Sequence, residues 1–386
     1  MATNPINNSA LSQKHKERLT FGLELEFAVA FIRPGSTDPN PKDTRPVDGL
    51  VTGPHDCWIA NLREHIAATF RAVNLKASAQ SPFTEESSDQ ALGAWTIKHD
   101  ETIKAPSNDA GYLFLPIEIS SPAYWNTDKA FAEVKLACQE LTKNYRILTN
   151  RSCGVHVHIG KGMRGFRFED IQNLLATLWT FEPVLETIHP RYRVQDQKMC
   201  PSFRRYSALA VNHTPRPQEG QQKGVLDVRG ALEEILGVQT GKFDHLVDLS
   251  MPQTRDSYMG GSRLAYHLGD VGGQLPVSSN YRRTIEFRQH KGSVKYSEIE
   301  MWIKFCLGIV MFADSVDRPQ LAPFLRAHSG RRKEDLKLEE VLRCLDMREL
   351  ADRYPKKIAQ DREEGEGKDE PLYSIEVGMT YLTTPL

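Results

Sequence analysis

The sequence lacks several features that would each assign it to a particular class of protein. It has no apolar run approaching the roughly 18 residues of a membrane-spanning helix. Its six cysteines lie far apart and never in C-x-x-C spacing, which is the pattern of neither a zinc framework nor a disulfide scaffold. The 49 Lys and Arg residues nearly balance the 50 Asp and Glu residues, so no global charge attracts nucleic acid or an anionic membrane.

The first 20 residues are polar and lack the apolar core of a secretion signal. Together with the scattered cysteines, this predicts a cytoplasmic protein. At 386 residues, with 40% hydrophobic and 26% charged residues, the chain has an ordinary globular composition. We expect a flexible N-terminal segment at residues 1–18, a single domain at 19–358, and a charged, largely disordered tail at 359–386.

Strand-like and helix-like patterns are mixed along the chain without a steady strand–helix alternation. Strands are predicted at residues 19–32, 91–103, 111–122, 151–162, 262–268 and 282–290. Helical spacing predicts helices at residues 56–72, 127–146, 168–189, 227–237, 297–316 and 335–358. Strands that alternate polar with apolar residues are typical of an antiparallel sheet. The pattern therefore predicts an α+β fold with an antiparallel sheet, helices on one face and the other face open.

Residues 190–260 show little regular pattern apart from the short helix at 227–237. Arg204 and Arg205 in this region could bind a phosphate or a substrate carboxylate, and a surface role fits them equally well. The long loop at 33–55 is rich in proline, glycine and aspartate. That loop and the 190–260 region are the candidates for a lid over an active site.

The segment GVHVHIG places two histidines two positions apart. In a strand, successive side chains point to opposite faces, so Val155, Val157 and Ile159 share one face. His156 and His158 share the other. Taken alone, this pattern also fits a strand with a solvated polar face.

Three further strands have one apolar face and one face with ionisable residues. The ionisable faces carry Glu24 and Glu26 in FGLELEF, Glu118 in YLFLPIEIS, and Glu286 and Arg288 in RRTIEFRQH. Glutamates held close together repel one another unless cations lie between them. Hard oxygen ligands with an added imidazole suit Mg²⁺ or Mn²⁺. The four strands together therefore indicate a divalent metal site.

The segments GLELEF, IEISSP, CGVHVHIG and RRTIEFRQHKGS occur in this order, and as a set they resemble the amidoligase family. This family is related to glutamate-cysteine ligase and glutamine synthetase. The resemblance covers roughly residues 19–312, with a departure at Ser293, where relatives tend to carry threonine. It implies a curved antiparallel sheet that forms an active-site funnel, with helices packed on its outer face, as in the catalytic domain of glutamine synthetase. The funnel of this superfamily binds ATP together with divalent ions.

The resemblance also implies a role for each matching residue. The metal ligands would be Glu24, Glu26, Glu118, His156 and Glu286. ATP phosphates would contact Arg288 and His156, and the catalytic group would comprise Arg288, Glu286 and His158, with His158 near the substrate. Asp100, in the segment KHDET, would contact substrate or metal.

The implied activity is that of an ATP- and Mg²⁺-dependent carboxylate–amine ligase. Such an enzyme forms an amide or peptide bond through an acyl-phosphate intermediate and releases ADP. Its partners would be a small-molecule or peptide carboxylate and an amine, with no nucleic acid and no membrane. The sequence leaves open the identity of both substrates, the residues that bind adenine, and the oligomeric state.

Two alternatives remain at this point. In some hydrolases, an H-x-H pair is the first part of a zinc-binding motif. Such motifs contain further His or Asp ligands soon after the pair, and HVHIGKGMRGF has none. A non-catalytic binding module that retains the fold is the other alternative. A lost metal ligand would mark such a module, whereas this chain retains all the residues that the resemblance assigns to metal.

Overall fold

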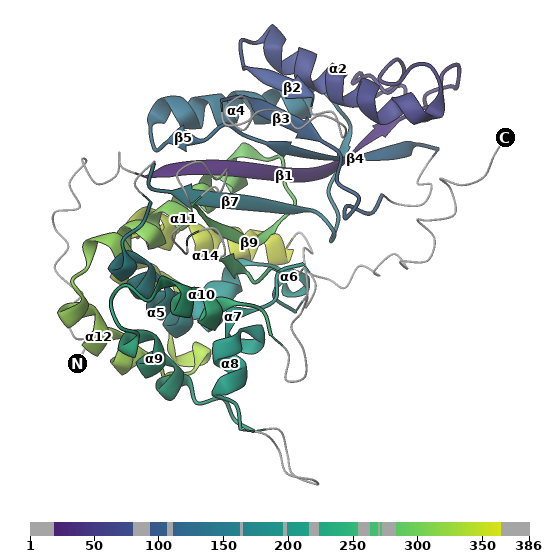
Figure 1. Cartoon of the computed structure of the whole chain (residues 1–386). Coiled ribbons are helices and arrows are strands. Elements are labelled where there is room, and N and C mark those ends of the chain that lie inside the picture. The colour runs from purple at the N-terminus through teal and green to yellow at the C-terminus, as the bar shows by residue number, and fades with distance from the viewer. Residues whose placement is uncertain are drawn as a thin grey trace. The chain divides into compact units, whose positions relative to one another are not determined.

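The computed structural model describes residues 19–79, 93–105, 111–162, 165–195, 199–215, 224–253, 263–268, 271 and 283–363 (Figure 1). These residues divide into two compact units. Within the described ranges, unit one comprises residues 19–21, 157–289 and 301–363, and unit two comprises residues 22–156 and 290–300. The expected single domain at 19–358 stays a prediction, and residues 1–18 and 364–386 lie outside the described part of the chain.

Most strands belong to unit two. They are β1 (Thr20–Phe31), β2 (Ala77–Ala79), β3 (Trp95–Lys98), β4 (Leu113–Ser120), β5 (Tyr124–Trp125), β6 (Ile147–Leu148) and the first part of β7 (Gly154–Gly160). Their order is β2-β3-β4-β1-β7, and β5 and β6 also pair with β1. The pairs β3–β4, β4–β1 and β1–β6 are antiparallel, whereas β2 and β3 are parallel.

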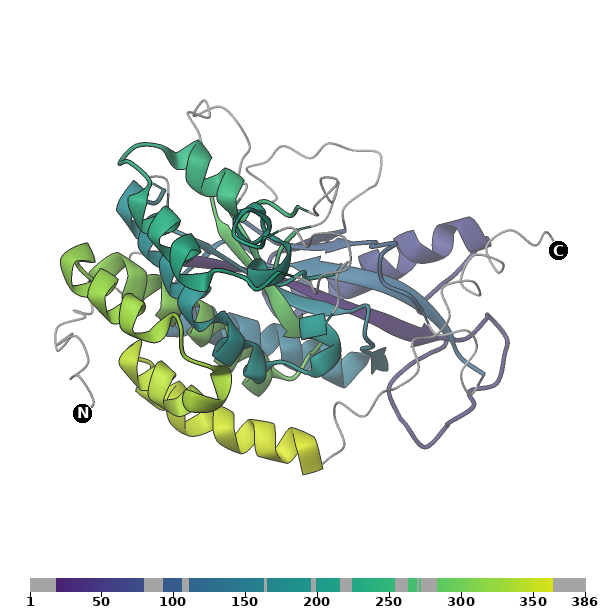
Figure 2. The same cartoon turned by 90° about the horizontal axis from the view of Figure 1, so that it is seen from below.

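Two helices of unit two, α2 (Trp58–Ala72) and α4 (Asp128–Asn144), lie on one face of these strands (Figures 1 and 2). A short 3-10 turn, η1 (His55–Cys57), precedes α2. Phe70 of α2 packs edge-on against Trp95 of β3, with ring centroids 5.5 Å apart. Thr127 caps α4, because its hydroxyl accepts a hydrogen bond from the backbone N–H of Ala130 at 3.3 Å.

Unit one contains the rest of β7, most of β9 (Ile285–Lys291) and β8 (Tyr266–His267), in the order β7-β9-β8. Strands β8 and β9 are antiparallel. The helices that follow β7 are α5 (Phe168–Leu185), η2 (Glu186–Ile188), α6 (Arg191–Gln195), α7 (Phe203–Tyr206), α8 (Ala208–Asn212), α9 (Val228–Gly237) and α10 (Phe243–Ser250). Those that follow β9 are α11 (Tyr296–Ser315), α12 (Arg318–His328), η3 (Lys333–Asp335), α13 (Leu338–Cys344) and α14 (Arg348–Glu363).

The apolar back of β9 packs against α11. Ile285 and Phe287 are fully buried, and the ring of Phe287 lies 6.3 Å from that of Trp302. Trp302 in turn stacks on Phe305 at 5.2 Å. This packing fixes the direction of the alternate side chains of β9, which are those with ionisable groups.

The chain thus forms an α+β structure with a mixed, mostly antiparallel sheet, which confirms the predicted fold class at this level. The expectation of a wholly antiparallel sheet is wrong for β2, which is parallel to β3. Three small residues, Ala77–Ala79, make up this strand, and so short a segment carries no alternation for sequence reasoning to detect.

Two stretches are more helical than the sequence suggested. The described parts of 190–260 contain α6, α7, α8 and α10 in addition to the predicted α9. Helix α14 continues to Glu363, so residues 359–363 are helical where a disordered tail was expected. Lys357 and Asp361 form an ion pair one helical turn apart at 2.5 Å, which supports the end of this helix despite its low apolar content.

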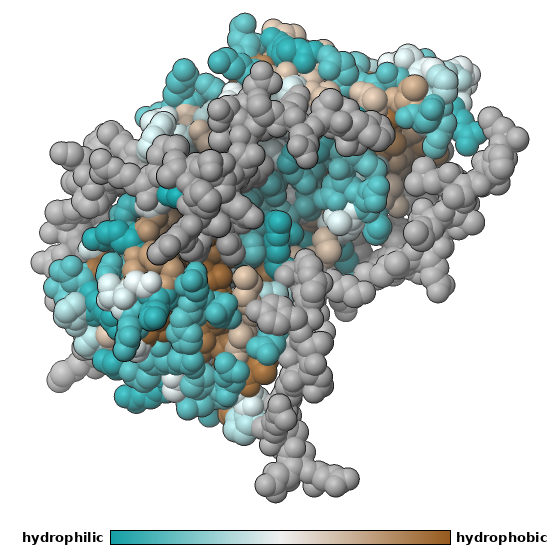
Figure 3. Space-filling view, in the orientation of Figure 1, coloured by the Kyte–Doolittle hydropathy of each residue, from teal (hydrophilic) through white to brown (hydrophobic). Residues whose placement is uncertain are grey.

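On the face shown in Figure 3, the described surface is mostly hydrophilic, with smaller hydrophobic patches between. Within the described ranges, no helix is both long enough and apolar enough to pass through a membrane.

Candidate active site

The register of three strands places ionisable residues of unit two in one row. Glu118 of β4 lies opposite Glu26 of β1 on one side and opposite Lys98 of β3 on the other. The adjoining positions pair Ile119 with Leu25 and with Ile97, all fully buried. Because side chains alternate along a strand, the charged row and the apolar row occupy opposite faces.

The charged row contains a cluster of carboxylates. Glu26, Asp100 and Glu118 each offer an oxygen atom, and these atoms lie within 4.8 Å of one another. Lys98 Nζ lies 3.1 Å from Glu118 Oε1 and 2.8 Å from Ser120 Oγ. Three carboxylates at this spacing favour a cation between them, and the ammonium group of Lys98 neutralises one of the three charges.

His156 adjoins this cluster. Its Nδ1 atom lies 3.3 Å from Glu24 Oε2 and 3.6 Å from Glu26 Oε1, and the residue is only 2% exposed. Glu26 also accepts a hydrogen bond of 2.6 Å from the backbone N–H of Gly154, at the start of β7. Five of the residues predicted to bind metal or substrate therefore meet within unit two: Glu24, Glu26, Asp100, Glu118 and His156.

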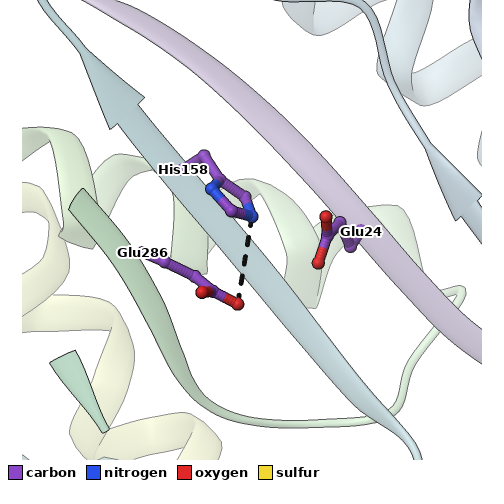
Figure 4. A group of neighbouring side chains, drawn as sticks. All are labelled: Glu24, His158 and Glu286. Carbon is purple, nitrogen blue, oxygen red and sulfur yellow. Dashed lines mark ion pairs between the residues drawn. The ribbon is translucent and has the colours of Figure 1, made fainter. Parts of the chain in front are cut away.

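A second group of predicted residues lies in unit one. Glu286 is 1% exposed and is paired with Arg288 and with Arg263, whose Nη1 lies 3.2 Å from Glu286 Oε2. His158 Nε2 lies 3.9 Å from Glu286 Oε1, and Figure 4 shows the two side chains pointing toward one another. The other ring nitrogen of His158 lies 3.2 Å from the hydroxyl of Thr284. The contact with Thr284 restricts the orientation of the imidazole, whereas 3.9 Å is beyond hydrogen-bonding distance for Glu286.

Arg193 forms hydrogen bonds with the backbone of β9 at Arg288 and Gln289. It is 1% exposed and donates from Nη2 to the carbonyl oxygen of Arg288 at 2.6 Å. Its Nε donates to the carbonyl oxygen of Gln289 at 3.4 Å. Helix α6, which carries Arg193, is thus tied directly to the strand of Glu286 and Arg288.

Arg204 and Arg205 contact a different pair of carboxylates. Glu182 of α5 accepts hydrogen bonds from the backbone N–H groups of Phe203 at 2.8 Å and Arg204 at 2.7 Å. Arg205 Nη2 lies 3.1 Å from Glu186 Oε2. The contacts that the structure describes for both arginines are thus made to α5, η2 and neighbouring loops, and none is to Glu286 or His158.

Burial perturbs the ionisation of this second carboxylate pair. Desolvation raises the pKa of Glu182, and it raises the pKa of Glu186 to about 7 with a further contribution from the charge of Glu182. Desolvation also lowers the pKa of Arg204 to about 10. The guanidinium of Arg204 lies 5.6 Å above the ring of Trp179, which compensates part of its lost hydration.

The loop at 33–55, a lid candidate from its length, is tied to the body of unit two. Arg146 donates to both carboxylate oxygens of Asp38, at 2.9 and 2.7 Å, and its Nε lies 3.4 Å from Asp43 Oδ2. The backbone N–H of Ile32 donates to the carbonyl of Val47 at 3.0 Å. A lid formed by this part of the loop would have to break these contacts, so its movement stays a prediction.

Sequence reasoning missed two basic residues beside the predicted ligands. Lys98 lies in the segment KHDET, but its contact with Glu118 depends on the register between β3 and β4. Arg263 precedes the short strand β8, and no local pattern distinguishes it from other surface arginines. The pairing of β8 with β9 brings it to Glu286.

Comparison with known families gives a match over residues 17–310 to the family described as "Putative amidoligase enzyme". The chain belongs to this family. The match covers every predicted site residue, and it confirms the resemblance drawn from the strand motifs. No curated protein matches the chain.

Two solved structures are similar to the chain at low identity. One is a bifunctional glutathione synthetase from Pasteurella multocida, at 10% identity and a TM-score of 0.34, covering 90% of this chain and 47% of that one. The other is the complex between the prokaryotic ubiquitin-like protein Pup and its ligase PafA, at 10% identity and a TM-score of 0.28, covering 93% of this chain and 60% of that one. The amidoligase chain thus spans less than two thirds of either structure.

Proposed function

We propose that the protein is an ATP- and Mg²⁺-dependent carboxylate–amine ligase that forms an amide or peptide bond through an acyl phosphate and releases ADP. The observation that carries this proposal is the carboxylate cluster of Glu26, Asp100 and Glu118, with oxygen atoms within 4.8 Å of one another, in a chain of the amidoligase family. A ligase of this kind needs divalent cations to neutralise triphosphate charge, and such a cluster supplies their ligands.

The donor set in unit two fits Mg²⁺ or Mn²⁺ better than zinc. It consists of carboxylates with one imidazole, which is a hard, oxygen-rich set. In unit two, Glu24, Glu26, Glu118 and His156 would hold an ion; in unit one, Glu286 would also be a metal ligand. The bound ion would supply charge neutralisation for the phosphates of ATP.

Arg288 is suited to binding the phosphoryl group that is transferred. Its guanidinium keeps its charge at all physiological pH values and offers two parallel N–H donors to phosphate oxygens. Its pairing with buried Glu286 and the anchoring of its backbone by Arg193 restrict its position. Arg263, paired with the same carboxylate, adds a second positive charge beside it.

His158 is suited to orienting a substrate. The contact of Nδ1 with the hydroxyl of Thr284 restricts the imidazole, and Nε2 is the ring nitrogen that would face a substrate. We propose that the substrates are a carboxylate and an amine, each a small molecule or a peptide, and that the strand face with the ionisable residues forms the funnel expected of the superfamily. A cytoplasmic location is part of the same proposal.

The function is tested by a screen for ADP release. Purified protein is incubated with ATP, Mg²⁺ and pools of amino acids, peptides and polyamines, and ADP is measured with a coupled assay. ADP formation that requires both a carboxylate and an amine, and that stops in EDTA, supports the ligase. Tight stoichiometric zinc with hydrolysis of amides in the absence of ATP would instead indicate a zinc hydrolase.

A further inference from the structure

Unit one contains a cavity of about 530 Å³ away from the strand face that carries Glu286. It is bounded by η2 and the residues after it, by α6, by Arg205 of α7 and by the last turns of α14. Its volume falls within the roughly 300–1,000 Å³ of pockets that bind small molecules.

Within unit one, helix α6 lies between this cavity and β9. Arg191 lines the cavity. Arg193, two residues later, points to β9 and donates to the carbonyl oxygens of Arg288 and Gln289. The cavity and the strand face with Glu286 therefore lie on different sides of one short helix.

Positive charge exceeds negative charge in the cavity wall. Its two carboxylates have cationic partners, since Glu186 pairs with Arg205 at 3.1 Å and Asp361 with Lys357 at 2.5 Å. Arg191 and Arg362 also line the cavity. Among the residues that the structure describes, neither side chain has an ion-pair or hydrogen-bond partner.

Two such guanidinium groups in the cavity lining offer planar, charged donor pairs that match the oxygens of a carboxylate or a phosphate. Ile358 adds an apolar surface to the lining, which suits the carbon skeleton of an organic molecule. We propose that this cavity binds a small organic anion through a carboxylate or phosphate group held by Arg191 and Arg362. The inference does not depend on the proposed ligase activity.

Isothermal titration calorimetry on the full chain, freed of metal ions with a chelating resin and without ATP, tests this site. Inorganic phosphate and succinate are titrated separately into the wild type and into Arg191→Gln, Arg362→Gln and Arg348→Gln. Arg348 is the matched control, because it lies on α14 with 84% of its side chain exposed and does not line the cavity. All three side chains are on the surface, so the variants should remain folded.

We expect binding of at least one of the two anions. The dissociation constant should rise about tenfold or more in Arg191→Gln and in Arg362→Gln, and it should be unchanged in the control. Binding of phosphate alone assigns a phosphate ligand, and binding of succinate alone assigns a carboxylate. Failure of the wild type to bind either anion, or equal affinity in all variants, would overturn the proposal.

Discussion

Replacing Glu26 by Gln should separate the metal-binding role of this residue from its role in folding. Glu26 and Asp100 offer oxygen atoms within 4.8 Å of each other, and at an effective dielectric constant of about 20 such charges repel by about 3 kcal/mol. Repulsion from Glu118 is left out, because the ammonium of Lys98 lies 3.1 Å from that carboxylate and offsets it.

The substitution also weakens one hydrogen bond. The Gly154 N–H would then donate to a neutral amide oxygen instead of a carboxylate, at a cost of about 1 kcal/mol. The two effects leave a net gain of about 2 kcal/mol in the free energy of unfolding of the metal-free protein. For a chain of 386 residues, this corresponds to a rise in Tm of about 2–3 °C.

Mg²⁺ should stabilise the wild type but not Glu26→Gln. At a concentration 100 times its Kd, an ion stabilises the wild type by about 2.7 kcal/mol, and this gain should be lost in Glu26→Gln. Differential scanning fluorimetry in EDTA and in Mg²⁺ measures both quantities. Glu64→Gln is the control, because Glu64 lies on the surface of α2 with 59% of its side chain exposed. An unchanged Mg²⁺ shift in Glu26→Gln, or a large loss of stability in EDTA, would refute the reasoning.

Three further predictions concern unit one. Arg288→Lys keeps the charge but loses the planar guanidinium with its two parallel N–H donors. Turnover should therefore fall by about 100-fold, or about 2.7 kcal/mol, while ATP affinity measured by calorimetry changes only a few-fold. A loss of ATP binding in this variant would contradict the role in phosphoryl transfer. His158→Ala should raise the KM of a substrate by about tenfold with little effect on ATP affinity, and an unchanged KM would remove His158 from the substrate site. Burial raises the pKa of Glu186 from 4.5 to about 7, so the folded state binds the proton more tightly than the unfolded state. This proton stabilises the fold fully below pH 4.5, and the stabilisation is lost as the pH rises through 7. The free energy of unfolding, measured with urea, should fall by up to about 3 kcal/mol from pH 5 to pH 8 in the wild type and by less in Glu186→Gln. An equal fall in both proteins would exclude this pKa for Glu186.

The alternation of side chains along a strand made most of the candidate site visible in the sequence. The face to which a side chain points in a strand depends on local backbone geometry alone. Glu24 and Glu26 could therefore be assigned to one face from the segment FGLELEF. The apolar backs of these strands confirmed the assignment, since Leu25 and Phe287 are fully buried.

Contacts that depend on strand register or on distant segments could not be predicted in this way. Lys98 meets Glu118 only because β3 and β4 pair in one particular register. The short helix α7 begins where Glu182, some 20 residues earlier, accepts the hydrogen bonds of its first N–H groups. A helix of four residues has no stability of its own, so its sequence carries little signal.

The most direct test of the proposed function is the affinity for ATP with and without a divalent cation. Clustered carboxylates repel a triphosphate, so ATP should bind only when Mg²⁺ lies between them. Titration calorimetry on the wild type should give clear binding in Mg²⁺ and none in excess EDTA. Equal ATP affinity under the two conditions would contradict the metal site and, with it, the proposed ligase.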